Sequence, residues 1–334
     1  MDQVEAVLAG DVGGTNTRLA LYPRGSVAEP LLLRVYPSAE FVGLQPIVAR
    51  FLAEAAQLTP HATVKRAAFG VAGPAEGIVV KFTNLPWIER TDGIARAFGL
   101  EHVVFINDFA AICRAVPHLA PAHLVHLGGG TPHPDAPKAV LGAGTGLGVG
   151  FLVRCGATYR VVASEGGHVD FAPRGPMQTR LADYLAAHRG GAYVENVLSG
   201  RGLANLYAFL RDSEGLAETT NARTTMERED PAAVITSRAM VGADPLCDRT
   251  LDLFCEIYGA FAATLALLVM AQGGIYVAGG IAGHIRGRLE GDPFRRAFEQ
   301  HVRYTDFLRS VPRSLIIHPQ PGLLGAALAA DEGT

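Results

Sequence analysis

Short apolar blocks separated by turn residues follow one another along the first third of the chain. The blocks at residues 6–10, 18–22, 31–36, 65–73, 77–82 and 102–108 have the length and composition of strands. Two longer segments, residues 43–56 and 93–99, carry apolar residues at helical spacing. The pattern predicts an α/β region that extends from Val4 to about Asp108.

A similar pattern begins again near Val140. Residues 139–153, AVLGAGTGLGVGFLV, repeat the strand, glycine turn and strand with which the chain opens. Further strands are expected at residues 274–280 and 313–319, and helices at 193–211, 231–240, 257–271 and 322–330. The polar residues 212–230 predict a surface loop. The apolar run at 257–271 is shorter than the ~20 residues of a membrane span, so we expect a buried core helix and no membrane association.

The first glycine turn, DVGGTNT at residues 11–17, has two interpretations. Glycines supply the positive φ of an ordinary hairpin turn without steric cost. A turn without bulky side chains also exposes backbone N–H groups to an anion, and the Asp11 carboxylate suits a hydrated cation. Two more glycine segments, GAGTGLG at 142–148 and VAGGIAGH at 277–284, follow in order. Together they predict two phosphate-binding hairpins and a strand-to-helix turn at a nucleoside.

The two commonest nucleotide-binding motifs are absent from the sequence. None of the three lysines, Lys65, Lys81 and Lys138, follows a glycine as a Walker A motif requires. The glycines at 142, 144, 146, 148 and 150 alternate and lead into a strand, which excludes the Rossmann fingerprint. Any bound phosphate must be held by the hairpins.

Composition and charge narrow the class of ligand. The 334 residues are 49% hydrophobic and 18% charged, which indicates a globular chain long enough for two domains. The net charge of −3 gives no basic field for nucleic acid, so we expect a small-molecule ligand. Four cysteines without C-x-x-C spacing, and no secretory signal before the first strand, favour the cytoplasm.

Nine motifs in this order resemble bacterial glucokinases, in the sugar-kinase branch of the actin-like ATPase superfamily. They are GDVGGTNTRLALY, GVAGP, TNLPW, FINDFAA, GAGTGLG, SEGGHVDFAPR, VENVLSGRGL, VAGGIAG and PGLLGAA, and they cover nearly the whole chain. The resemblance implies two RNase H-like α/β domains with an active-site cleft between them. We expect a small domain of residues 1–116 plus 319–334 and a large domain of residues 117–318.

The resemblance implies ATP-dependent phosphorylation of glucose at its 6-hydroxyl, a step of glycolysis. Asp108 is the expected general base, although a carboxylate after a strand is also a common helix cap. The resemblance places glucose among polar side chains that can bond hydroxyl groups. These sugar-side residues are Thr83, Asn84, Asn107, Asp108, Gly146, Glu165, His168 and Glu195. For Glu195, an exposed position on a helix remains the alternative.

The ATP side follows from the same resemblance. Asp11 is expected to hold Mg²⁺ through water, because magnesium retains several of its own waters. The expected contacts to ATP are Gly13, Gly14, Thr15, Asn16, Thr145, Gly279 and Gly280. A homodimer is implied by the resemblance alone.

A related family of repressors and kinases carries a cysteine-rich zinc motif just after its sugar-contacting histidine. Here His168 is followed by VDFAPRGPMQTR, which contains no cysteine, so we expect the zinc-free group and no zinc. Two alternatives remain: a kinase for another hexose or an amino sugar, and a sugar-responsive regulator without catalysis. A regulator would be expected to lose Asp108 or a phosphate hairpin, and the sequence retains them.

Overall fold

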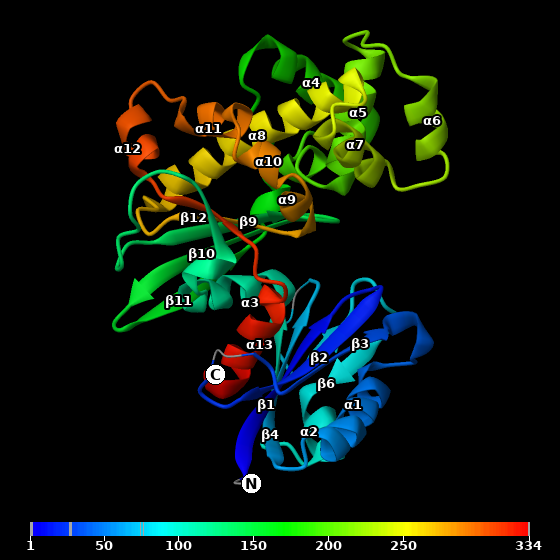
Figure 1. The fold of residues 1–334 in the computed structure, drawn as a ribbon, viewed down its shortest axis with the longest axis vertical. Coiled ribbons are helices and arrows are strands. Elements are labelled where there is room, and N and C mark those ends of the chain that lie inside the picture. Colours follow the sequence, from blue (N-terminus) through cyan, green and yellow to red (C-terminus); the bar gives the residue numbers. More distant parts are fainter. Residues whose placement is uncertain (1–2, 27–28, 74, 76, 333–334) are drawn as a thin grey trace. The chain divides into compact units, whose positions relative to one another are not determined.

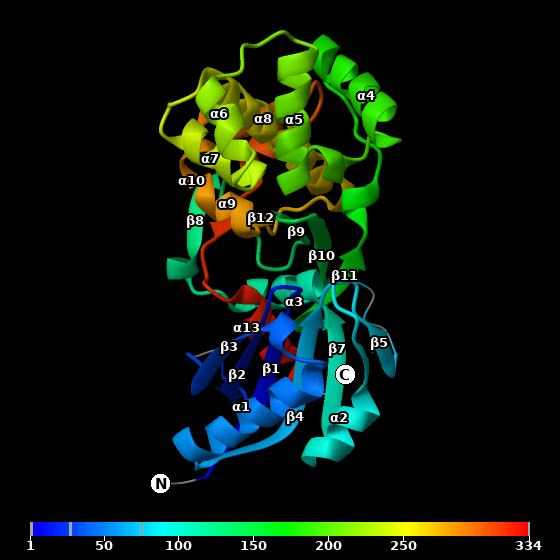
Figure 2. The same ribbon diagram turned by 90° about the vertical axis from the view of Figure 1, so that its right-hand side faces the viewer.

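The computed structural model describes residues 3–26, 29–73, 75 and 77–332. The chain forms two compact units, shown in Figures 1 and 2. Unit 1 comprises Met1–Ala120 together with His318–Thr334, and unit 2 comprises Pro121–Ile317. The C-terminal segment therefore returns to the unit that contains the N-terminus.

Unit 1 is built on a five-stranded mixed sheet. The strand order is β3-β2-β1-β4-β7, in which β1 pairs antiparallel with β2 and parallel with β4, and β4 pairs parallel with β7. The predicted opening hairpin is confirmed by the pairing of β1 and β2. The strands are β1 (Val4–Val12), β2 (Asn16–Pro23), β3 (Leu32–Pro37), β4 (Ala62–Val71) and β7 (His102–Asn107).

Alternate residues of this sheet enter two separate cores. Leu8 and Phe69 pack with helix α1 (Leu44–Leu58) and helix α2 (Thr91–Phe98). Their neighbours Ala9 and Ala68 pack with helix α13 (Pro321–Glu332), beside helix α3 (Asp108–Ala115). Since strand side chains alternate between faces, this division gives a three-layer unit with the sheet in the middle.

Smaller elements complete unit 1. The strands β5 (Val79–Lys81) and β6 (Ile88–Arg90) form a separate two-stranded ribbon. Unit 1 also contains the single-turn helices η1 (Ser38–Glu40) and η2 (Val116–His118). A similar turn, η3 (Pro121–His123), begins unit 2. Helix α13 packs so closely on α3 that a Cβ added at Gly325 would overlap the carbonyl of Ala111. The glycine there permits the close approach of the two helices.

Unit 2 repeats the same strand order. Its sheet runs β11-β10-β9-β12-β13-β8, and its first five strands correspond in order and direction to the five strands of unit 1. The sixth strand, β8, pairs antiparallel at the edge. The strands are β8 (Leu124–Gly128), β9 (Lys138–Ala143), β10 (Leu147–Cys155), β11 (Thr158–Ser164), β12 (Ile275–Ala278) and β13 (Arg313–Ile316). The repeat predicted from the second glycine hairpin is thus confirmed.

The core of unit 2 is largely helical. Helix α8 packs against α5, α7 and α11 and against strand β9. The helical elements of unit 2 after η3 are η4 (Gly166–His168), α4 (Gly175–Arg189), η5 (Val194–Asn196), α5 (Gly200–Asp212), α6 (Thr220–Met226), α7 (Pro231–Met240), α8 (Pro245–Val269), α9 (Gly280–His284), α10 (Arg286–Leu289), α11 (Asp292–Glu299) and α12 (Thr305–Ser310).

Helix α8 is longer than predicted. It begins at Pro245, where Asp244 caps two backbone N–H groups, and ends before Met270 in the left-handed conformation. By length and a mean hydropathy of 1.7 it resembles a membrane span, but 61% of that window is buried within the protein. Its apolar residues fill the core of unit 2, as expected for the buried helix predicted at this position.

Two predicted elements are wrong in detail. Residues 193–211 do not form one helix, because the short turn η5 precedes α5 and Ser199 caps the start of α5. Residues 212–230 are not all loop, because Thr219 caps the short helix α6, whose Ala222 is buried. Both errors arise because capping bonds and burial fix helix boundaries that apolar spacing leaves open.

Candidate functional site

In unit 1, the carboxyl ends of three parallel strands meet at one edge of the sheet. Val12 of β1 pairs with Val71 of β4, and Val71 pairs with Asn107 of β7. The candidate acids Asp11 and Asp108 stand at the ends of β1 and β7, on either side of β4. Ligands of open α/β sheets bind at such edges.

Asn107 and Asp108 stand next to each other at the start of α3, and Asn107 is the residue that caps the helix. The side-chain oxygen of Asn107 accepts from the N–H groups of Phe109 and Ala110 at 3.0 and 2.9 Å, so Asn107 is the helix cap. Its Nδ2 donates to the carbonyl of Gly73 at 3.2 Å. Asp108 Oδ1 accepts from the Phe109 N–H at 2.8 Å. The amide of Asn107 retains one N–H for a ligand. Asp108 shares the Phe109 N–H with Asn107, whereas the Ala110 N–H is bonded by Asn107 alone.

The first hairpin turn is stabilised by its own backbone and by a serine. Gly13 N–H donates to Asn16 O at 3.0 Å, and Ser38 donates through Oγ to Gly13 O and through its N–H to Thr15 O. Thr15 is exposed at the tip of the turn. The backbone at the tip is therefore held in place before any ligand arrives.

The TNLPW segment lies against this turn. A Cβ added at Gly14 would lie 3.0 Å from Cβ of Asn84, so the hairpin and Asn84 are in contact. Thr83 Oγ1 donates to Ala72 O at 3.1 Å and also lies close to Gly73. The structure thus places Asn84 against Gly14 and Thr83 against Gly73, while both side chains stay exposed.

Asp11 is a half-buried carboxylate with a single cationic neighbour among the described residues. Arg18 Nη1 lies 3.4 Å from Asp11 Oδ2. Burial raises the pKa of Asp11 above its ordinary value, and the attraction of Arg18 opposes the rise only in part. A site that leaves an anionic carboxylate under-compensated favours a bound cation.

In unit 2, the second hairpin turn is attached to Glu195. Oε2 of Glu195 accepts from the Leu147 N–H at 2.9 Å, and a Cβ at Gly146 would lie 2.6 Å from the same oxygen. Gly144 N–H donates to Gly146 O at 2.8 Å, and Thr145 is exposed at the tip. The glycine at 146 allows the carboxylate to reach the turn. The alternative of an exposed Glu195 on one long helix is wrong, since Glu195 lies in the single-turn helix η5 and its side chain is only 20% exposed.

Glu165 and His168 lie next to this hairpin. Glu165 precedes η4 and His168 is its last residue. The turn η4 packs on β10 and on η5, and a Cβ at Gly167 would overlap the Leu147 carbonyl. His168 Nε2 and Glu165 Oε2 are 3.9 Å apart, and the two side chains are 62% and 79% exposed. The structure therefore gathers Gly146, Glu165, His168 and Glu195 in one part of unit 2, with two of the side chains open to solvent.

A cavity of about 430 Å³ opens beside Glu195 in unit 2. Arg201, which the sequence analysis did not select, lies in its wall with Nη2 3.6 Å from Glu195 Oε1. Ser199 also lines it and caps α5, and Gly200 N–H donates to Gly144 O at 2.9 Å. The start of α5 is thereby fixed against the second hairpin, a contact that no sequence spacing signals.

Gly279 and Gly280 form the predicted turn from strand β12 to helix α9. Gly279 has φ of +91°, and a Cβ there would overlap the carbonyl of Ala143 in β9. The close approach of the backbones and the positive φ both require glycine. Gly280 is exposed and has open space around its Cα.

The candidate residues are divided between the units. Unit 1 contains the first hairpin together with Asp11, Thr83, Asn84, Asn107 and Asp108. Unit 2 contains the second hairpin together with Glu165, His168, Glu195, Gly279 and Gly280. Sequence reasoning missed Arg18, Ser38, Ser199 and Arg201, since only pairing across the fold brings them to these turns. No cluster of three or more His, Cys, Asp or Glu able to hold a metal occurs within residues 3–26, 29–73, 75 and 77–332.

Solved structures with the same fold include a glucokinase from an Antarctic psychrotroph, 32% identical with a TM-score of 0.85 over 99% of this chain and 100% of that one. A hexokinase from Thermus thermophilus, at 22% identity and a TM-score of 0.67, covers 97% of both chains and shares the fold. The fold and the two glycine hairpins define the class as sugar kinases with the actin-like ATPase fold.

The glucokinase family model matches residues 8–333. A glucokinase of Nostoc punctiforme is 40% identical over 97% of this chain and 98% of its own length. A glucokinase of Yersinia pestis is also 40% identical, over 96% of this chain and 94% of its own. The chain belongs to the glucokinase family.

Proposed function

We propose that Asp108 is the general base in the ATP-dependent phosphorylation of glucose that this member of the glucokinase family catalyses. The observation that carries the assignment is the position of the carboxylate at the end of β7. This end is separated only by β4 from the end of β1 that bears Asp11, and Asn107 supplies the helix cap. Asp108 would accept the proton of the glucose 6-hydroxyl as its oxygen attacks the γ-phosphorus of ATP. ADP leaves, and the product is glucose 6-phosphate.

Glucose binding is assigned to polar groups of both units. Glu165, His168 and Glu195 supply acceptors and an imidazole for sugar hydroxyls. Oε2 of the Glu195 carboxylate already accepts the Leu147 N–H, so Oε1, which faces Arg201 at 3.6 Å, is the oxygen offered to the sugar. Asn107 offers its remaining amide N–H. Backbone at Gly146 and side chains of Thr83 and Asn84 complete the proposed set.

ATP binding is assigned to the glycine turns. Backbone N–H groups at Gly14 and Asn16 and the exposed hydroxyls of Thr15 and Thr145 suit phosphate oxygens. Gly13, whose N–H donates to Asn16 O, shapes the turn that presents them. Gly279 and Gly280 let the backbone approach the nucleoside. The donor set of Asp11 fits Mg²⁺, because magnesium takes one or two carboxylates together with waters and phosphates. When bound, the metal neutralises phosphate charge.

The setting of the reaction is also a proposal. A glucose kinase serves glycolysis in the cytoplasm, and cysteines with no paired spacing accord with that compartment. We propose a homodimer without zinc, whose partners are glucose and ATP and not nucleic acid or membrane. Sedimentation analysis would test the dimer, and elemental analysis finding one zinc per chain would overturn the assignment to the zinc-free group.

One assay tests the function directly. ADP release would be measured with glucose, mannose, fructose and N-acetylglucosamine as acceptors, in the wild type and in Asp108→Asn. We expect release with glucose to dominate, to vanish with EDTA and to return with Mg²⁺. Faster release with another sugar would favour the second candidate, a kinase for that sugar, and no release with any of them would favour a regulator.

A further inference from the structure

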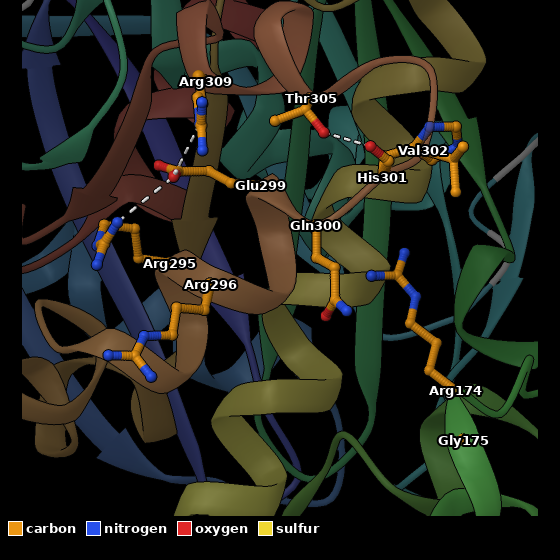
Figure 3. Close-up of a pocket in the computed structure, with 10 residues that line it drawn as sticks. All are labelled: Arg174, Gly175, Arg295, Arg296, Glu299, Gln300, His301, Val302, Thr305 and Arg309. Carbon is orange, nitrogen blue, oxygen red and sulfur yellow. Dashed lines mark hydrogen bonds and ion pairs between the residues drawn. The ribbon is translucent and has the colours of Figure 1, made fainter.

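One cavity of unit 2 is lined by arginines and by none of the candidate site residues. It measures about 1230 Å³ and is bounded by Arg174 at the start of α4, by residues of α11 and by the 300–309 segment (Figure 3). Four arginines face it against one carboxylate, that of Glu299. This surplus of positive charge in a concave surface contrasts with the net charge of −3 of the whole chain. We refer to it as the arginine pocket.

The charges on one wall of the pocket are partly compensated. Arg295 Nη1 lies 3.4 Å and Arg309 Nε 3.8 Å from Oε2 of Glu299. Oε1 of Glu299 is occupied by the buried Arg313 at 3.0 Å. One carboxylate therefore faces three guanidinium groups. Asp292 neutralises part of the remaining positive charge through ion pairs with Arg295 and Arg296, each at 2.6 Å.

The opposite wall carries an arginine without a carboxylate partner among the described residues. Arg174 donates to the backbone carbonyls of Ala297 and Ala260, at 2.8 and 3.4 Å, and forms no ion pair. Burial disfavours its charged form and lowers its pKa below the ordinary value. An anion in the pocket would supply the counter-charge that this guanidinium lacks.

Neutral donors lie among the arginines. The amide of Gln300 stands between Arg296 and Arg174 in Figure 3, and all three residues also line an adjoining cavity of about 340 Å³. His301 Nδ1 accepts the N–H groups of Arg303 and Tyr304, each at 3.1 Å. The proton of its neutral ring therefore resides on Nε2, which adds a donor. Guanidinium forks with neutral donors match the oxygens of phosphate groups.

We propose that the arginine pocket binds a phosphorylated small molecule carrying at least two negative charges. A singly charged anion would be satisfied by Arg174 alone, whereas Arg295, Arg296 and Arg309 retain positive charge that only a second anionic group would neutralise. The cavity, at about 1230 Å³, is somewhat larger than most small-molecule sites and has room for such a ligand. The overall negative charge of the chain disfavours an extended polyanion such as a nucleic acid. The proposal does not depend on the kinase assignment.

The test uses inorganic pyrophosphate as the probe and the full-length chain. Calorimetry and thermal denaturation would compare the wild type with the double variant Arg174→Gln and Arg296→Gln. The matched control is Arg286→Gln, since Arg286 is an exposed arginine of unit 2 paired with a carboxylate four residues away, as Arg296 is, but outside the pocket. AMPPNP and glucose at saturation would occupy the candidate catalytic residues throughout.

We expect pyrophosphate to bind the wild type and the control with equal affinity, to raise their melting temperatures, and to bind the double variant at least ten-fold more weakly. The turnover of the double variant without pyrophosphate should equal that of the wild type. Equal pyrophosphate binding by the wild type and the double variant would overturn the proposal, as would the absence of binding to the wild type. Tighter binding of a single-stranded oligonucleotide than of pyrophosphate would replace it with a nucleic-acid site.

Discussion

Glu195 and Leu147, forty-eight positions apart, are joined by a hydrogen bond of 2.9 Å between Oε2 and the backbone N–H. The bond ties the turn η5 to the first residue of β10, directly after the second glycine hairpin. Because a charge-assisted bond to backbone is stronger than a neutral one, it fixes the hairpin relative to the proposed sugar contacts.

The first prediction concerns Gly146, which precedes Leu147 and lies against the Glu195 carboxylate. Gly146→Ala should displace the Glu195 carboxylate, because the new Cβ would lie 2.6 Å from Oε2. Loss of a hydrogen bond to a charged group costs about 1.5–3 kcal/mol. We expect a lower melting temperature and a higher KM for glucose.

The control for this variant is Gly144→Ala in the same turn, where a Cβ would meet no heavy atom within 4 Å. Its melting temperature should match that of the wild type. Equal melting temperatures for all three proteins would mean that the Glu195 bond contributes nothing to the hairpin.

The second prediction separates the base from the cap. Asp108→Asn should lower kcat by about 10²–10⁴-fold, the effect of removing a general base, with little change in melting temperature. Asn107→Ala should instead lower the free energy of unfolding by roughly 0.5–2 kcal/mol, because it removes the cap of α3. Denaturant titrations and ADP-release kinetics would measure both. Near-normal turnover of Asp108→Asn would return that carboxylate to a structural role.

The third prediction concerns Asp11 and pH. Burial raises the pKa of Asp11 in the folded state, so at neutral pH its ionisation favours the unfolded chain. The stability that this group contributes is therefore present at low pH and is lost as pH rises through the raised folded pKa. Asp11→Asn should be at least as stable as the wild type at pH 8, and the difference should shrink as pH falls through that pKa.

The catalytic activity of Asp11→Asn should fall, although its stability at pH 8 should not. A metal partner acting through water is worth about 10–100-fold, so Asp11→Asn should lose that factor in turnover at saturating ATP and require more Mg²⁺. Thermal denaturation at several pH values and Mg²⁺ titrations would measure the two effects. A variant less stable than the wild type at pH 8 would show that Arg18 outweighs the burial of the carboxylate.

The fourth prediction concerns the two exposed sugar-side residues. Glu165→Gln and His168→Ala should weaken glucose binding by about ten-fold or more, since a lost bond to a charged group is worth about 1.5–3 kcal/mol. Stability should not change, because both side chains are mostly exposed. Glu229→Gln, an exposed glutamate outside the proposed site, serves as the control. Calorimetry that finds equal glucose affinity in all four proteins would remove both residues from the site.

The sequence determined the elements and their repetition. Alternating apolar residues flanked by glycines predict the hairpin of β1 and β2 and that of β9 and β10, because strand periodicity and turn conformation are local properties. The apolar residues 322–330 likewise predict α13, which extends over Pro321–Glu332. Motifs in a fixed order were sufficient to identify the family that the full-length comparisons establish.

Tertiary structure decided how individual side chains are used. Sequence alone left Asp108 as base or cap, and the choice of Asn107 as cap follows from where its amide lies relative to Gly73 and α3. The same holds for Glu195, whose helical pattern gave way to a turn bonded to Leu147. The arginine pocket left no sequence signal, because it draws on Arg174 and on residues more than a hundred positions later. Hydrogen bonds and burial between distant segments depend on the folded backbone, which local periodicity does not encode.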